Sequence, residues 1–240
     1  MAVKSITMFA ALYKKQMRET LPEIVVVASV TVLIGLFVYF KLGSLLSAVA
    51  VAMVMVLGLA SFLPLISSLR LGQEWNNNTI YLMMSLPVGG GMILGSRLTA
   101  LLTQYILGTL IVGIVGMLLA FGMFPDDFGY YLKLSLPYWD EAFLLYLLTV
   151  MILAYFISIS FFSQIIGKLV SRFSGLVTLV TFIGTLWLSG EAMSLLWGQV
   201  SIGPPDISTQ LLAVSVGQIT LVAAVIMTLA VLIYDRRVEL

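Results

Sequence analysis

The sequence predicts an all-α, polytopic membrane protein with six transmembrane helices, and its composition and charge pattern lead to this prediction. Hydrophobic residues make up 61% of the 240 positions and charged residues only 10%, with a mean hydropathy of +1.12. Such a composition leaves too little polar surface for a soluble globular protein. The charges also lie between uncharged runs, each reaching the roughly 17 residues needed to cross a bilayer. We therefore expect a single transmembrane domain over residues 1–240.

The uncharged runs define the expected order of the spans. We place them at about residues 24–41, 44–69, 97–122, 141–167, 173–190 and 207–234. An even number of spans puts both ends of the chain on the same side of the membrane. Ten of the twelve basic residues fall on that side, and only Lys41 and Lys133 fall on the other. By the positive-inside rule, this asymmetry predicts a multi-pass protein of the cell membrane with both termini in the cytoplasm.

A short amphipathic helix is expected before the first span, over residues 4–20. One face of it carries apolar residues at helical spacing, namely Ile6, Phe9, Ala10, Tyr13 and Met17. The cations of the other face should lie among anionic headgroups at the cytoplasmic interface, and Pro22 should end the helix. The helix could be a simple orientation signal or an elbow helix that braces the bundle. The residues expected at its interface are Phe9, Tyr13, Lys14, Lys15 and Arg18.

Several classes of chemistry are excluded by the residues that the chain lacks. It contains no cysteine and no histidine, which excludes disulfides, thiolate nucleophiles, Cys/His zinc sites and histidine proton shuttles. The stretch from Gly90 to Arg97 lacks the lysine of a phosphate-binding loop, so the chain should not hydrolyse ATP by itself. Ionisable residues are missing from the middle of the expected spans, which disfavours ion-coupled transport. We expect no catalytic, cofactor-binding or metal-ligating residue, and no nucleic-acid partner.

Two segments on the outer side carry further candidates. The aromatic-rich stretch 122–140 is typical of an interfacial belt, with a lid over a substrate as the alternative. Residues 190–206 are bounded by glycine and Gly-Pro-Pro and could form a re-entrant or surface helix. Within this stretch, Glu191 and Trp197 are candidates for an outer gate, with a plain interfacial carboxylate as the other interpretation of Glu191.

A polar segment, residues 70–91, separates the second span from the third. If it is helical from residue 74, one face carries Trp75, Thr79, Leu82, Met83 and Leu86. Glu74 near the start suits the positive end of the helix dipole, and Pro87 with the following glycines ends the helix. Such a segment is either an ordinary helix on the membrane surface or a docking element for a cytoplasmic protein.

The spacing of Glu74, Thr79, Pro87 and Val88 resembles the pattern Glu-x4-Thr-x7-Pro-Val found between the second and third spans of type-2 ATP-binding-cassette (ABC) exporter permeases. The six spans, the amino-terminal helix and the total length are similar to that family over the whole chain. In the family this segment is the coupling helix, which inserts into a groove of the ATPase subunit. This chain departs from the family pattern at Trp75, Asn76, Asn78 and Tyr81.

The resemblance implies a permease subunit with an elbow helix and a coupling helix, paired with a second permease subunit as a homo- or heterodimer. Two copies of a cytoplasmic ABC ATPase would bind ATP and magnesium. The assembly would export a hydrophobic or amphipathic substrate, such as a peptide toxin or bacteriocin, a drug or a lipid, by alternating access. The ATPase-coupling residues would be Glu74, Trp75, Thr79, Leu82, Met83 and Pro87. The alternatives are an ion-coupled secondary transporter and a non-transporting membrane scaffold.

Overall fold

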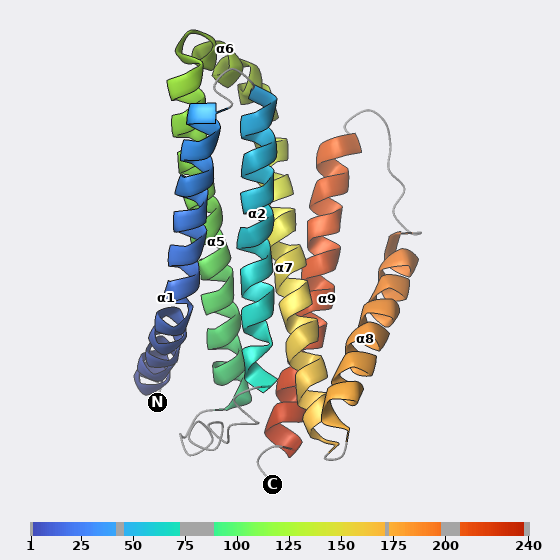
Figure 1. The fold of residues 1–240 in the computed structure, drawn as a ribbon. Coiled ribbons are helices and arrows are strands. Elements are labelled where there is room, and N and C mark those ends of the chain that lie inside the picture. The colour runs from blue at the N-terminus through green and yellow to red at the C-terminus, as the bar shows by residue number, and fades with distance from the viewer. Residues whose placement is uncertain (1, 42–45, 73–88, 171–172, 198–206, 238–240) are drawn as a thin grey trace.

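A computed structural model describes residues 2–41, 46–72, 89–170, 173–197 and 207–237, and these residues form helices joined by short turns. Six of the described helices are long and apolar enough to cross a membrane, which confirms the all-α class with six long apolar helices and is consistent with a polytopic membrane protein. They are α1 (Ala2–Lys41), α2 (Leu46–Ser68), α5 (Gly90–Met123), α7 (Trp139–Lys168), α8 (Ser174–Trp197) and α9 (Ile207–Arg237). A short helix, α6 (Pro125–Ser135), and a 3₁₀ turn, η1 (Leu136–Tyr138), close one end of the bundle between α5 and α7 (Figure 1).

α5 and α8 each extend about two turns beyond the span expected from their uncharged run. α5 begins at Gly90 rather than near residue 97, so Arg97 lies inside the helix, where it is only 2% exposed. α8 continues past residue 190 to Trp197, so the described part of the outer stretch 190–206 prolongs this helix. A charged or glycine residue in the sequence therefore marked the end of an apolar run without marking the end of the helix.

The prediction that Pro22 ends a separate amino-terminal helix is wrong, because α1 runs without interruption from Ala2 to Lys41. Proline inside a helix removes one backbone hydrogen bond and costs about 3 kcal/mol. Contacts with α5 on both sides of Pro22 offset this cost: Tyr13 donates to Thr103 before it, and Gln104 donates to Glu23 after it. In Figure 1 the amino-terminal part of α1 leaves the line of the rest of the helix, as expected for a proline kink.

The largest hydrophobic core lies where α2 and α5 come together with α7 and α9. Its most deeply buried side chains include Leu71, Leu94, Ile157, Phe161 and Ala230, each 0% exposed. A second cluster joins α7 to α9 through Tyr155, Ile159, Val222, Ala223 and Ile226. A third joins α1, α2 and α5 through Val27, Val56, Ala60 and Val112. α7 packs against α2, α5, α8 and α9, and it therefore links the two sides of the bundle.

α8 is the least covered of the six spans. Only 6% of its most apolar stretch is buried, against 33% for the span that contains α7. Figure 1 shows α8 packed near α7 at the lower end of the bundle and diverging from α9 toward the other end. An apolar helix left this open must face lipid or another chain.

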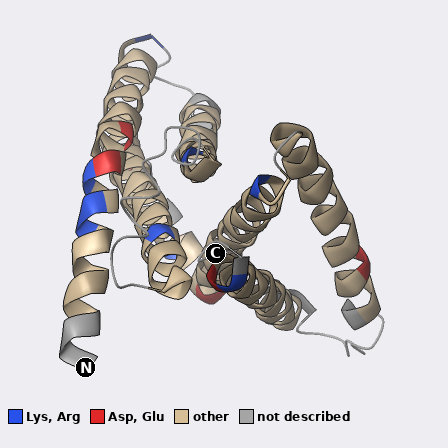
Figure 2. Cartoon of the chain, turned by 90° about the horizontal axis from the view of Figure 1, so that it is seen from below, with Lys and Arg blue, Asp and Glu red and all other residues tan. Residues whose placement is uncertain are grey.

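Both ends of the chain lie at the same end of the bundle, opposite α6 (Figure 1). The end of α2, the start of α5, the end of α7 and the start of α8 lie at this end too. Figure 2, viewed from this end, shows Lys and Arg residues on several of the helices that meet there. We call it the terminal end of the bundle. Its assignment to the cytoplasm is the prediction made from the charges.

Candidate functional site

The six residues expected to contact an ATPase, from Glu74 to Pro87, lie outside the described residues. The structure does describe the two points from which this segment departs. After α2, a turn at Leu69 leads into helical residues that reach Gly72, and α5 begins at Gly90 with Gly89 as its N-cap. Around these two points the helices exchange three sets of polar contacts, which together form a polar layer near the terminal end of the bundle.

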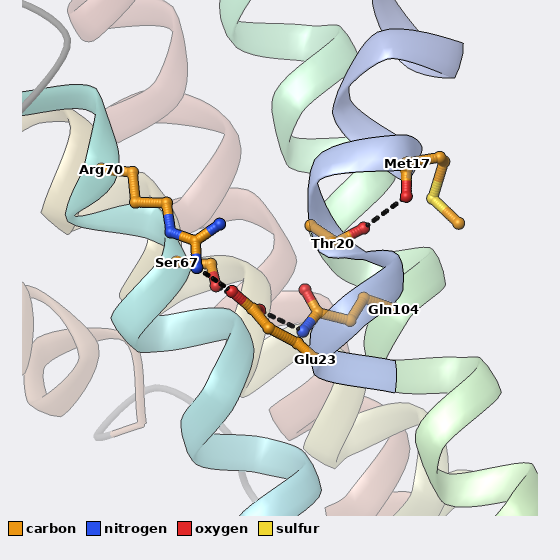
Figure 3. Close-up of polar contacts among 6 residues, drawn as sticks. All are labelled: Met17, Thr20, Glu23, Ser67, Arg70 and Gln104. Atoms are coloured by element: carbon orange, nitrogen blue, oxygen red, sulfur yellow. Dashed lines mark hydrogen bonds and ion pairs between the residues drawn. The ribbon is translucent and has the colours of Figure 1, made fainter. Parts of the chain in front are cut away.

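The first set surrounds the carboxylate of Glu23 and joins three helices (Figure 3). Ser67 Oγ of α2 donates to Oε2 at 2.5 Å, and Gln104 Nε2 of α5 donates to the same oxygen at 2.7 Å. The guanidinium of Arg70 pairs with Oε1. The Glu23 side chain is only 12% exposed. These donors and the cation therefore compensate for the hydration that the carboxylate loses on burial.

Gln104 contributes to this cluster with its amide nitrogen facing the carboxylate. The opposite orientation would set two acceptors against each other, so the contact determines which way the amide points. Its Oε1 is buried and accepts no hydrogen bond from the described residues. Nearby, Thr20 donates to the carbonyl oxygen of Met17 in its own helix at 3.2 Å (Figure 3).

The second set centres on Gln164 of α7, which is 5% exposed. Its Nε2 donates to Ser160 Oγ at 2.8 Å and to the backbone oxygen of Ser68 at 3.1 Å. Its Oε1 accepts the backbone N–H of Gly72 at 2.6 Å. Ser68 Oγ also donates to Ser160 Oγ at 2.8 Å. One amide thus satisfies both a donor and an acceptor of the α2 backbone where that helix ends.

The third set joins the start of α5 to the end of α9. Asp235 Oδ1 accepts the backbone N–H of Gly90 at 2.6 Å. The first N–H groups of a helix have no partner within it, and Gly89 has no side chain to cap them. Asp235 supplies the missing acceptor, and its negative charge suits the positive end of the α5 dipole.

Glycine is required at residue 90 because α9 approaches the backbone so closely. A Cβ at this position would collide with the ring of Tyr234 and lie 2.6 Å from Asp235 Oδ1. Gly72 is nearly as constrained, since a Cβ there would lie 3.0 Å from Gln164 Oε1. Both departure points of the segment are therefore glycines held against a neighbouring helix.

The residues expected at the elbow interface lie on the first turns of α1. Phe9 and Tyr13 are half-buried against α5, and Tyr13 Oη donates to Thr103 Oγ1 at 3.2 Å. Lys14, Lys15 and Arg18 are exposed, and Lys15 lies 3.7 Å from Glu19 one turn later. The buried face differs from the expected apolar stripe, because Gln16 and Thr20 are buried while Ile6 is 69% exposed.

The structure does not bring the two outer-gate candidates into a described contact with each other. Glu191 is exposed in the last turns of α8, and the side chain of Trp197 lies outside the described residues. In the aromatic stretch, Tyr130, Tyr138 and Trp139 are more than half exposed, at 66%, 60% and 54%. Exposed aromatics at one end of a membrane bundle are typical of an interfacial belt.

An apolar groove of about 370 Å³ lies among α7, α8 and α9. Its walls include Phe162, Leu188, Ala192, Leu221, Val225 and Leu229. Ser189 is one of its few polar lining residues, and its hydroxyl is hydrogen-bonded to Tyr155 at 2.5 Å. A second pocket of about 340 Å³, more polar in character, lies at the start of α8 beside Gly72, Gln164 and Lys168.

The polar layer was not anticipated from the sequence, although one local signal was present. Ser160 and Gln164 stand four residues apart, and Ser67 and Arg70 three apart, so each pair shares a helix face within an apolar run. Such pairs indicate a polar contact with another helix. They do not indicate which helix, because the partners are 44 to 96 residues away along the chain.

The chemistry available in the polar layer is that of structural hydrogen bonding. Among the described residues, no group of three or more Asp or Glu side chains could hold a metal ion. The carboxylates and amides are instead engaged in contacts between helices. No protein-family model matches this chain, and no match was found among curated proteins or solved structures.

Proposed function

We propose that this chain is the membrane-spanning permease subunit of an ATP-driven exporter of the type-2 ABC class. The observation that carries this proposal is where the described residues on either side of the 73–88 segment lie. Gly72 and Gly90 are both at the terminal end of the bundle, together with both ends of the chain (Figure 1). The sequence between them holds the spacing of Glu74, Thr79 and Pro87 that resembles a coupling helix. In this proposal, residues 73–88 dock on a cytoplasmic ATPase.

The partners follow from what the chain itself lacks. Two copies of an ABC ATPase would bind ATP and magnesium and supply the energy, because this sequence carries no phosphate-binding loop. A second permease subunit, identical or different, would complete the translocation path. The poor coverage of α8 within one chain supports a second subunit, although lipid could cover the same surface.

The proposed cargo is hydrophobic or amphipathic, moved out of the cytoplasm or the inner leaflet by alternating access. The groove among α7, α8 and α9 supports this class, because its lining is almost wholly apolar. A sugar or a small ion would lose its hydration there without gaining replacement hydrogen bonds. The amino-terminal turns of α1, which rest on α5 through Tyr13, would act as the elbow that braces the bundle.

The experiment that tests the proposal is purification of this chain from its native membranes, with identification of any ABC ATPase that co-purifies, followed by reconstitution in liposomes. Glu74→Arg and Trp75→Ala should weaken ATPase association and transport, while thermal unfolding of the permease in detergent stays unchanged. Glu19→Ala, which alters an exposed carboxylate of α1 at the same end, serves as the control. Wild-type transport and wild-type association in both segment variants would refute the proposal.

The same preparation separates the alternatives. Transport driven by an ion gradient in liposomes without any ATPase would establish a secondary transporter. In that case the Glu23 cluster would be the first place to look for coupling, since its carboxylate lies inside the bundle. A chain that binds partners but moves no cargo under either condition would be a scaffold.

A further inference from the structure

We propose that Gln164 on α7 and Asp235 on α9 are positioning residues, which fasten the two ends of the 73–88 connection to the α7–α9 pair. A push on the connection would then move α7 and α9 directly, and not only α2 and α5, from which the connection departs. The fastening consists of the contacts of Gln164 with Gly72 and of Asp235 with Gly90. The role of these contacts in coupling to an ATPase rests on the proposed function.

The first fastening point is Gly72. Its N–H is shared between the carbonyl oxygen of Leu69 at 3.2 Å and Gln164 Oε1 at 2.6 Å, and the contact with Gln164 is the shorter. Gln164 is itself held by Ser160 and by the Ser68 carbonyl. The last turn after α2 therefore cannot move away from α7 without leaving buried donors and acceptors unpaired, which is costly.

The second fastening point is Gly90. Asp235 stands in the last turn of α9, where a negative charge is unfavourable to its own helix dipole. Its position is explained by the neighbouring helix, whose first N–H it accepts. The ring of Tyr234 also leaves no room for a side chain at residue 90. The start of α5 therefore packs directly against the end of α9.

Apolar anchors lie next to both polar contacts and belong to one core. Leu71 precedes Gly72 and is 0% exposed, and Leu94 in the first turns of α5 is also 0% exposed. Both lie in the cluster that contains Phe161 of α7 and Tyr234 of α9. The residues at both ends of the connection thus contact the α7–α9 pair. At each end, one hydrogen bond fixes the geometry and one buried apolar side chain adds packing contacts.

The two helices that contact the ends of the connection also line the apolar groove. α9 carries Asp235 at its last turn and lines the groove with Leu221, Val225 and Leu229. α7 carries Gln164 and lines the same groove with the neighbouring Phe162. A rigid helix moved at one end moves at the other, so a displacement at residues 72 and 90 would change the shape of the groove.

The fastening itself is tested without any ATPase, by amide hydrogen exchange at Gly72 and Gly90 in the full-length protein in detergent. Asp235→Ala should speed exchange at Gly90 about tenfold or more, and Gln164→Leu should do the same at Gly72. Asp235→Asn keeps an acceptor and should restore most of the protection at Gly90. Unchanged exchange in both Asp235→Ala and Gln164→Leu would overturn the proposal.

The coupling role is tested in the reconstituted complex with its ATPase. Asp235→Ala and Gln164→Leu should retain wild-type ATPase association but lose most of the ATP hydrolysis that a membrane-active amphipathic peptide stimulates, and Asp235→Asn should recover part of it. Arg236→Ala, an exposed neighbour, and Ser158→Ala, a buried hydroxyl bonded within its own helix, are the matched controls. Both should behave as wild type.

The outcomes separate the two proposals. Faster exchange with wild-type stimulation would show that the contacts exist but do not couple, which overturns the positioning role. Loss of ATPase association in the Gln164 and Asp235 variants would overturn it too, since the residues would then act on docking. If the wild-type chain binds no ATPase at all, the proposed function fails and the coupling role with it, while the exchange experiment still decides the fastening.

Discussion

The bundle has two halves, one formed by α1, α2 and α5 and the other by α7, α8 and α9, and the contacts within the two halves differ. α1, α2 and α5 share apolar clusters and also meet at the Glu23 carboxylate, which receives hydrogen bonds from Ser67 and Gln104 and pairs with Arg70. α7, α8 and α9 meet mainly through apolar side chains, and an apolar groove lies among them. Hydrogen bonds are directional and select one arrangement, whereas apolar contacts tolerate sliding. The first half is thus built to keep its shape, and the second to adapt.

The contrast also explains where the halves are joined. Gly72 and Gly90 belong to the first half, and their partners Gln164 and Asp235 belong to the second. Both contacts lie near the terminal end of the bundle, while the groove runs along the middle of α8 and α9. A rigid half joined at one end to an adaptable half can transmit a displacement without itself deforming.

The largest effect on stability is expected from Glu23→Ala, which removes the acceptor shared by three helices. Ser67 and Gln104 would be left as buried donors without a partner, while Arg70, 44% exposed, can turn to water. We expect a loss of about 3 kcal/mol in the free energy of unfolding, measured by thermal unfolding in detergent. Glu19→Ala, at an exposed ion pair, should cost less than about 0.5 kcal/mol. Equal losses in the two variants would contradict a rigid first half.

The next effect concerns a tight contact in the second half, between α7 and the start of α8. A Cβ at Gly167 would collide with the Thr178 hydroxyl and lie 2.9 Å from the backbone oxygen of Ser174. Gly167→Ala should therefore cost about 2 kcal/mol in unfolding free energy. Gly184→Ala on α8, where a Cβ meets nothing within 4 Å, should be neutral or stabilising. A neutral Gly167→Ala would mean that α8 is free to shift even at this contact.

A smaller effect is expected from Tyr155→Phe, which removes a buried hydroxyl between α7 and α8. Its partner Ser189 also donates to the backbone oxygens of Thr185 and Leu186, so it is not stranded by the change. We expect a loss of about 1 kcal/mol, measured in the same unfolding assay. A loss as large as that of Glu23→Ala would show that the second half also depends on a hydrogen bond between its helices.

The smallest effect on stability, and the sharpest test of the groove, is expected from Ala192→Trp. Ala192 lines the groove from α8, and a large side chain there would occupy part of it. Unfolding free energy should change by less than about 0.5 kcal/mol, because the site is exposed within the chain. Cargo-stimulated ATP hydrolysis should fall. Leu195→Trp on the same helix, 73% exposed and outside the groove lining, is the matched control. Equal activity in the two variants would argue that cargo does not use the groove.

The six spans were predictable because the signal for a transmembrane helix is local. Each needs about 20 apolar residues in a row, and any window of the sequence reveals whether they are present. The exact ends were less predictable. α5 begins at Gly90, where Asp235 accepts its first N–H, and α8 continues past Glu191, whose side chain is exposed.

The continuity of α1 and the polar layer could not be read from the sequence. Pro22 is a helix breaker by local rules, and contacts with neighbouring helices, among them those of Tyr13 and Glu23 with α5, support the continuous helix. Gln104, Gln164 and Asp235 look like isolated polar residues until their partners, 81, 92 and 145 residues away, are placed beside them. The candidate coupling residues from Glu74 to Pro87 rest on their spacing alone and remain a prediction.

The sequence by itself therefore determined the class of protein, the number of membrane-spanning helices and the shared side of the two chain ends. All three depend on hydrophobic length and its order along the chain. Only the tertiary structure decided which helices are joined by hydrogen bonds and which leave a groove between them. In an apolar bundle most helix pairs are compatible by hydrophobicity, so the choice among them depends on a few polar groups and glycines that find complementary partners only in three dimensions.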